Sequence, residues 1–109
     1  MRTLAADSGL ALEVLSATAF GGMPPVAEDT GTFPGNARRK AQALHARLPA
    51  GHWSLADDSG LCVDALEGAP GVESAYYAGP ASDPAANLAK LVAVMAGVPP
   101  AARGAHFVC

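Results

Sequence analysis

The pattern of apolar and polar positions predicts two amphipathic helices in this chain. The first is expected between Thr32, a residue type that caps helix starts, and Leu48, which is followed by Pro49. Pro34 fits its first turn. Its apolar side chains recur at the spacing of one buried face, namely Ala37, Ala41, Leu44 and Leu48. Asn36 and Lys40 lie four positions apart, so they share an adjacent face of this helix.

The second helix is expected to begin at Asp83, as the cap, with Pro84 in its first position, and to end at Gly97. Its apolar face comprises Leu88, Leu91, Val92 and Met95. Asn87 and Lys90 lie off this face, so we expect both side chains to be solvated.

Short strands are predicted between and beyond these helices. Alternation of apolar and polar residues predicts a strand over residues 10–14 and another that starts at residue 105. Two short apolar runs, at 53–56 and 61–63, flank a polar interruption and also indicate strands. Residues 1–7 resemble the end of a helix, closed by Ser8-Gly9. Helices that alternate with strands predict one α/β domain over residues 1–109.

Charge and composition exclude several classes of protein. The formal net charge is −3 and no basic block is present, which argues against a nucleic-acid polymer as partner. No apolar run is long enough to span a bilayer, and no leader pattern is visible, so we expect no membrane partner and a cytoplasmic location. The two cysteines do not indicate a disulfide framework or a zinc site.

The stretch LADDSGLCVDALEGAPG, from Leu55 to Gly71, carries the candidate chemistry. Asp57 and Asp58 follow an apolar run directly, and polar residues just past a strand are frequent ligand-binding residues in α/β sheets. Adjacent carboxylates without a nearby cation favour a divalent metal, and oxygen ligands suit magnesium. The same four residues, Asp-Asp-Ser-Gly, also favour a plain turn, and the pattern alone favours that interpretation.

Four segments together carry a resemblance to a known family: AEDTGTFPGNARRKA at 27–41, LADDSGLCVDALEGAPGVESAYYAG at 55–79, NLAKL at 87–91 and the final RGAHFVC. In this order and at these spacings they resemble the non-canonical purine nucleoside triphosphate pyrophosphatases, also called inosine triphosphate pyrophosphatases or XTP/dITP diphosphatases. The resemblance implies a mixed central sheet flanked by helices and a homodimer. It further implies magnesium-dependent hydrolysis of ITP, dITP and XTP to the nucleoside monophosphate and pyrophosphate.

The resemblance also assigns residues to roles. Asp58 would hold magnesium and act as the catalytic carboxylate, while Ser59, Lys40 and Asn36 would contact the substrate. The family usually has Glu-Thr-Gly before its Thr-Phe pair, so Asp29 is the matching metal ligand. The chain has one residue fewer between that Gly and the Thr-Phe pair, and Glu28 is the alternative ligand.

Some parts of the family pattern are not found in this sequence. The family has a Ser/Thr-x-Asn-x-x-Lys phosphate loop before its first helix, and a Gly-Tyr-Asp loop, a Lys and a Ser-His-Arg motif later in the chain. We therefore expect a partial domain. The second hypothesis is a catalytically inactive remnant of the fold that binds a nucleotide or metal weakly, or only dimerises.

Overall fold

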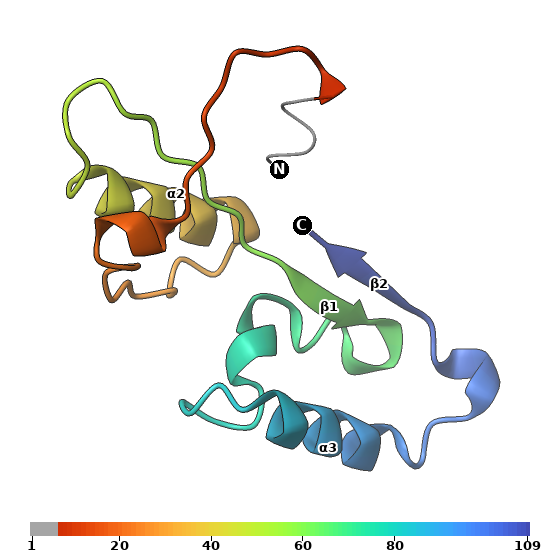
Figure 1. The fold of residues 1–109 in the computed structure, drawn as a ribbon. Coiled ribbons are helices and arrows are strands. Elements are labelled where there is room, and N and C mark those ends of the chain that lie inside the picture. The colour runs from red at the N-terminus through yellow and green to blue at the C-terminus, as the bar shows by residue number, and fades with distance from the viewer. Residues whose placement is uncertain (1–6) are drawn as a thin grey trace.

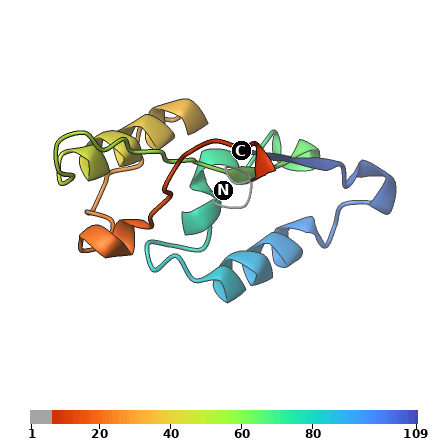
Figure 2. The ribbon, with the colours of Figure 1, turned by 45° about the horizontal axis from the view of Figure 1, so that its top comes forward.

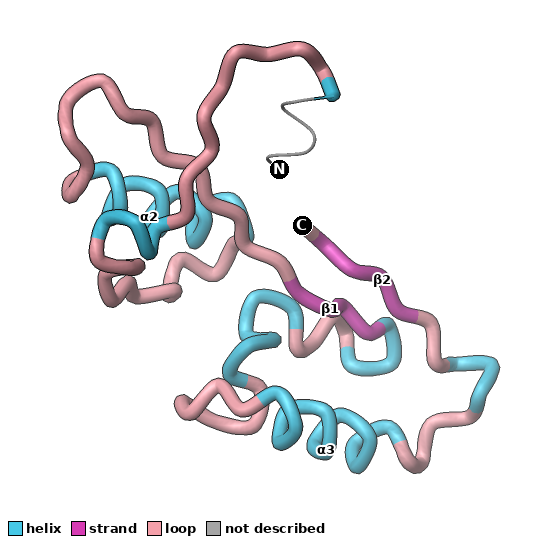
Figure 3. Tube along the Cα trace, in the orientation of Figure 1, coloured by secondary structure: helices cyan, strands magenta, loops and turns pink. Residues whose placement is uncertain are grey.

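The computed structural model describes residues 7–109, and the helix end expected at residues 1–7 lies outside them apart from Asp7. The main elements are two α-helices and two short strands, separated by loops and 3-10 turns (Figure 3). In chain order they are η1 (Ala17–Phe20), α2 (Phe33–His45), β1 (Gly60–Val63), η2 (Asp64–Leu66), η3 (Gly71–Tyr76), α3 (Pro84–Met95), η4 (Pro100–Ala102) and β2 (Ala105–Val108).

Helix α2 confirms the predicted cap and first turn. The side chain of Thr32 accepts a hydrogen bond from the backbone N–H of Gly35 at 3.0 Å, and Pro34 lies in the first turn. The helix ends at His45, three residues before the predicted end, and the chain continues as turns towards Pro49. Pro49 disfavours helical backbone at Leu48, so the helix does not continue to the predicted end.

Helix α3 also confirms its cap, because Asp83 accepts from the N–H of Ala85 at 3.0 Å. Lys90 is exposed, as expected, whereas Asn87 is half-buried, and both side chains also bond to the preceding loop. Asn87 accepts from the N–H of Ala78 at 2.8 Å and donates to the carbonyl of Ala75 at 2.9 Å. The ammonium of Lys90 donates to the carbonyl of Tyr77 at 2.7 Å and lies 4.2 Å from the centre of its ring. Both side chains therefore hold the preceding loop against α3.

Strands β1 and β2 pair antiparallel and confirm the strands expected at 61–63 and from residue 105. Gly60 lies opposite Val108 and Val63 lies opposite Ala105. The strand partners are about 45 residues apart, so this pairing closes the second half of the chain into one unit (Figure 1). Helices combined with a sheet confirm the α/β class, and the sheet in residues 7–109 consists of this one pair.

The strands expected at residues 10–14 and 53–56 are not formed. Both segments lack regular secondary structure, and the N–H of Leu12 instead bonds locally to the carbonyl of Leu10 at 2.9 Å. A strand needs the backbone of a neighbour to complete its hydrogen bonds. The two-stranded sheet in residues 7–109 includes neither segment, so an apolar pattern alone does not produce a strand.

The molecule is elongated, with α2 on one side and the β1–β2 pair with α3 on the other (Figures 1 and 2). The radius of gyration is 17.2 Å, whereas a compact domain of about 100 residues has about 13 Å. Among residues 7–109, Val63 is the apolar side chain that is buried. Large apolar side chains remain exposed, including Leu10, Leu12, Trp53, Leu55, Leu88, Val92 and Phe107. No helix within this range is long and apolar enough to cross a bilayer.

Gly60 begins β1 at a point where only glycine fits. A Cβ at this position would overlap the carbonyl oxygen of Gly71 and lie 2.7 Å from Oγ of Ser74. We expect Gly60→Ala to lower the free energy of unfolding by about 2 kcal/mol, because overpacked sites shift backbone. Urea unfolding measures this. Gly97→Ala is the control, since nothing lies within 4 Å of its added methyl group, and an equal loss in both variants would contradict the packing argument.

Candidate functional site

The candidate site forms where the segment leading into β1 passes α2, and it centres on the ammonium group of Lys40. This nitrogen lies 2.9 Å from Oδ1 of Asp58 and 2.6 Å from Oε1 of Glu28. It also donates to the backbone carbonyl of Asp57 at 3.2 Å. The side chains are largely shielded: 26% of Lys40, 9% of Asp58 and 13% of Glu28 is exposed. One cation thus holds two carboxylates that are 30 residues apart in the sequence.

Asn36 braces Asp58 from the adjacent turn of α2. Its amide donates to Oδ2 of Asp58 at 3.3 Å, and its own oxygen accepts from the N–H and the hydroxyl of Thr30 at 3.2 and 2.7 Å. The residue has 0% exposed surface. The predicted contact between Asn36 and the substrate stays a prediction, and in the structure both ends of the buried amide are engaged within the chain. Its observed contacts link the 28–31 loop to Asp58.

The structure separates the two acidic residues between which the sequence left the choice open. Glu28 faces the site through Lys40, whereas Asp29 turns outward and pairs with Arg39, leaving 67% of its side chain exposed. A signal for Glu28 was present in the sequence. The family pattern Glu-Thr-Gly-x-Thr-Phe places the Glu four positions before the Thr of the Thr-Phe pair. In this chain the residue four positions before Thr32 is Glu28, not Asp29.

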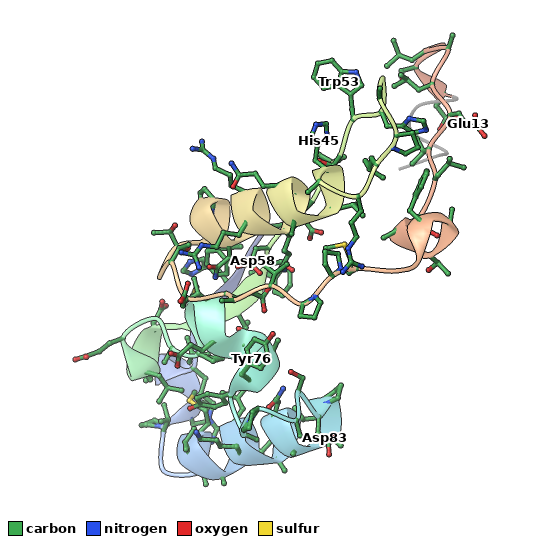
Figure 4. All side chains as sticks on the ribbon, turned by 90° about the vertical axis from the view of Figure 1, so that its left-hand side faces the viewer. Glu13, His45, Trp53, Asp58, Tyr76 and Asp83 are labelled. Atoms are coloured by element: carbon green, nitrogen blue, oxygen red, sulfur yellow. The ribbon has the colours of Figure 1, made fainter. Side chains whose placement is uncertain are left out.

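The Asp-Asp-Ser-Gly stretch does not form the turn that its composition allows. Residues 57–59 form no turn and lead directly into β1 at Gly60. Asp58 lies between α2 and the segment that carries Tyr76 (Figure 4). The neighbouring Asp57 is exposed, and its carboxylate lies 3.8 Å from the thiol of Cys109. Ser59 is half-buried, and no hydrogen bond joins its hydroxyl to another residue of the described range.

Tyr76 is a member of this site that the sequence did not assign. Its hydroxyl donates to Oε2 of Glu28 at 2.5 Å, across 48 residues of chain. Glu28 therefore has one oxygen on Lys40 and the other on Tyr76, just as Asp58 has one on Lys40 and the other on Asn36. No sequence pattern connects residues so far apart, so this contact needed the structure.

The ion pairs shift the pKa values of three groups. Hydrogen bonds from Lys40 and Tyr76 lower the pKa of Glu28 below 4.5 and outweigh the opposing effect of its burial. Burial alone would lower the pKa of Lys40, but hydrogen bonds to Glu28 and Asp58 and their negative charges raise it above 10.5. The bond to Glu28 is the largest cause that raises the pKa of Tyr76 above 10.0. Lys40 is therefore positive and Glu28 negative at neutral pH.

The lowered pKa of Glu28 predicts a dependence of stability on acid. Because the folded-state pKa lies below the unfolded value of 4.5, the contribution of Glu28 is fully present above 4.5 and is lost as the pH falls through the folded-state value. Urea unfolding should show wild type more stable than Glu28→Gln at neutral pH, with the difference shrinking as the solution becomes more acidic. Glu73→Gln removes an exposed carboxylate as the control. A difference that grows in acid would contradict the role of Glu28.

The donor set fits a hard divalent cation that is completed by other ligands. No group of three or more His, Cys, Asp or Glu side chains in residues 7–109 gathers at one point. Glu28 and Asp58 provide two carboxylates, and magnesium is commonly bound by one or two carboxylates together with waters and substrate phosphates. Lys40 is the charge that separates the two carboxylates in the structure.

Comparisons with known sequences give a consistent result. The profile of the Ham1 family matches residues 1–109. The chain is 65% identical over 105 residues to the dITP/XTP pyrophosphatase of Opitutus terrae, covering 96% of this chain and 52% of the relative. It is 47% identical over 111 residues to the dITP/XTP pyrophosphatase of Streptomyces avermitilis, covering 100% and 54%. The chain spans about half the length of the curated relatives that it matches.

Solved structures agree with the sequence comparisons. A Ham1 protein from Coxiella burnetii is similar with a TM-score of 0.74 and 34% identity, over 92% of this chain and 49% of that chain. The nucleoside-triphosphatase / dITP/XTP pyrophosphatase from Mycobacterium abscessus gives a TM-score of 0.73 and 38% identity, over 97% and 54%. The arrangement of α2, α3 and the β1–β2 pair is therefore that of about half of a Ham1 protein.

Proposed function

The chain belongs to the Ham1 family, and we propose that it takes part in hydrolysing the non-canonical purine nucleoside triphosphates ITP, dITP and XTP. The products are the nucleoside monophosphate and pyrophosphate. The observation that carries this proposal is the pair of shielded carboxylates, Glu28 and Asp58, held on the single ammonium group of Lys40. The names of the relatives, which are dITP/XTP pyrophosphatases, support the same reaction.

Each residue of the site has a proposed role. Asp58 orients and deprotonates the attacking water, whose oxygen bonds to the α-phosphorus while the bond to the bridging oxygen of the pyrophosphate breaks. Lys40 neutralises a phosphate, and the hydroxyl of Ser59 donates to another. We propose Glu28 as the second metal-binding carboxylate in preference to Asp29, since Asp29 is paired with Arg39. Mg²⁺, if bound, would be held by Glu28 and Asp58 and would offset the negative charge of the phosphates.

Release of pyrophosphate tests the proposal directly. The purified chain is incubated with dITP, XTP or dGTP, with Mg²⁺ or with excess EDTA, and pyrophosphate is measured with a coupled assay. We expect release that requires Mg²⁺ and favours dITP and XTP over dGTP. The proposal would be overturned if the chain showed no pyrophosphate release and no Mg²⁺-dependent nucleotide binding.

A second candidate function has a specific observation in its favour. The radius of gyration of 17.2 Å and the exposed apolar segments favour a unit that binds nucleotide or metal and associates with another protein surface. This unit would bind Mg²⁺ and nucleotide without turnover. A homodimer in the cytoplasm remains our proposal for both candidates, and sedimentation at two concentrations distinguishes a dilution-stable dimer from polydisperse association.

A further inference from the structure

Glu28 lies in a loop whose backbone is held to α2 on either side, by Arg39 at the carbonyl of Ala27 and by Asn36 at the N–H of Thr30. Residues 23–29 lack regular secondary structure, and Glu28 contacts the site through its side-chain carboxylate. A carboxylate that binds a cation must be held in one orientation, and hydrogen bonds from neighbouring residues to the carboxylate fix that orientation. Lys40 holds Oε1 of Glu28 at 2.6 Å, but it pairs with Asp58 as well. Oε2 of Glu28 is held by the hydroxyl of Tyr76.

The segment that carries Tyr76 is held by hydrogen bonds to both β1 and α3. Within η3, the hydroxyl of Ser74 accepts from the N–H of Leu61 in β1 at 3.0 Å and donates to the carbonyl of Gly71 at 2.6 Å. On the other side, Asn87 of α3 binds the backbone of the residues before and after the tyrosine pair, Ala75 and Ala78. The backbone at Tyr76 is thus fastened to both β1 and α3.

We propose that Tyr76 is a positioning residue that fixes the carboxylate of Glu28 opposite Asp58, so that the pair is arranged for a divalent cation before the cation binds. The inference rests on the proposed function, which assigns the metal to Glu28 and Asp58. Through this contact the half of the molecule with β1 and α3 sets the geometry of a loop that belongs to the half with α2. Asn87 and Lys90, which hold the loop next to Tyr76, support the same alignment from α3.

The test removes one oxygen atom. Tyr76→Phe keeps the ring and deletes the donor, and Tyr77→Phe is the matched control, because Lys90 contacts the ring and the backbone carbonyl of Tyr77 rather than its hydroxyl. Each variant of the full chain is titrated with Mn²⁺, followed by the electron paramagnetic resonance signal of the free ion, and Mg²⁺ is then added as competitor. Thermal unfolding without metal is recorded in parallel.

We expect Tyr76→Phe to bind Mn²⁺ about tenfold more weakly than wild type, with a nearly unchanged melting temperature, while Tyr77→Phe binds as wild type does. In the Glu28→Gln background the Tyr76→Phe change should have no further effect on Mn²⁺ affinity, because the carboxylate that Tyr76 orients is absent. A structural role alone would lower the melting temperature and leave the affinity of the folded protein unchanged.

Three results would overturn the inference. Equal Mn²⁺ affinity in wild type and Tyr76→Phe would do so and leave the metal site itself standing. Loss of the folded state in Tyr76→Phe would show that the hydroxyl of Tyr76 stabilises the whole fold rather than orienting Glu28. Absence of Mn²⁺ and Mg²⁺ binding in wild type would remove the proposed function together with the inference.

Discussion

Asp58→Asn is expected to reduce Mg²⁺-dependent pyrophosphate release by about a hundredfold or more, the range associated with losing a catalytic acid or base. The amide has nearly the shape of the carboxylate but carries no charge, so it can neither deprotonate water nor compete for a cation. Its oxygen can still accept from Asn36, which keeps that side of the site satisfied. Its amino group would then face the ammonium of Lys40 in place of the ion pair at 2.9 Å.

Asp57→Asn is the matched control for this prediction, because it makes the same change one residue earlier. Asp57 is exposed, and Lys40 contacts its backbone carbonyl rather than its carboxylate. Circular dichroism should show both variants folded, and the pyrophosphate assay with dITP should separate them. Near-normal release by Asp58→Asn, or an equal loss in Asp57→Asn, would remove Asp58 from its proposed catalytic role.

The helices could be predicted from sequence because their signals are local. Thr32 and Asp83 cap the helices that follow them, and each cap bonds to a backbone N–H only two or three residues later. The strands depend on distant backbone. The run at 61–63 became β1 because residues 105–108 lie beside it, whereas the similarly apolar pattern at 10–14 forms no strand in the described range. Pairing, not alternation, decides which segment is a strand.

The sequence predicted only those site residues that belong to the motifs carrying the family resemblance. The resemblance assigned Lys40 and Asp58 to one site, and their side chains form an ion pair, while the roles assigned to them in substrate and metal binding stay predictions. The role of Asn36 depends on burial, which a helical pattern does not reveal for a polar residue. The choice between Glu28 and Asp29 depends on the direction in which a loop turns, and Tyr76 joins the site from η3. These three features are set by tertiary structure.

Lys40→Met is expected to lower the free energy of unfolding by about 2 kcal/mol at neutral pH without metal, since hydrogen bonds to charged groups contribute about this much. The variant leaves the shielded carboxylates of Glu28 and Asp58 close together without the cation that now lies between them. Acid should reduce the difference in unfolding free energy between Lys40→Met and wild type, because protonation of Glu28 removes its repulsion with Asp58. Urea unfolding at neutral and acidic pH measures both effects.

Magnesium should stabilise Lys40→Met more than it stabilises wild type. In the variant the added cation relieves the repulsion between Glu28 and Asp58, whereas in wild type Lys40 already does so and must give way. Arg38→Met is the control, since it removes one positive charge from an exposed position of the same helix. If Mg²⁺ raised the unfolding free energy of all three proteins equally, the cation would be binding elsewhere, and the assignment of Glu28 and Asp58 as its ligands would fail. A larger effect confined to Lys40→Met would mean that lysine and metal compete for the same two carboxylates, and that Lys40 becomes available to a phosphate once the metal is bound.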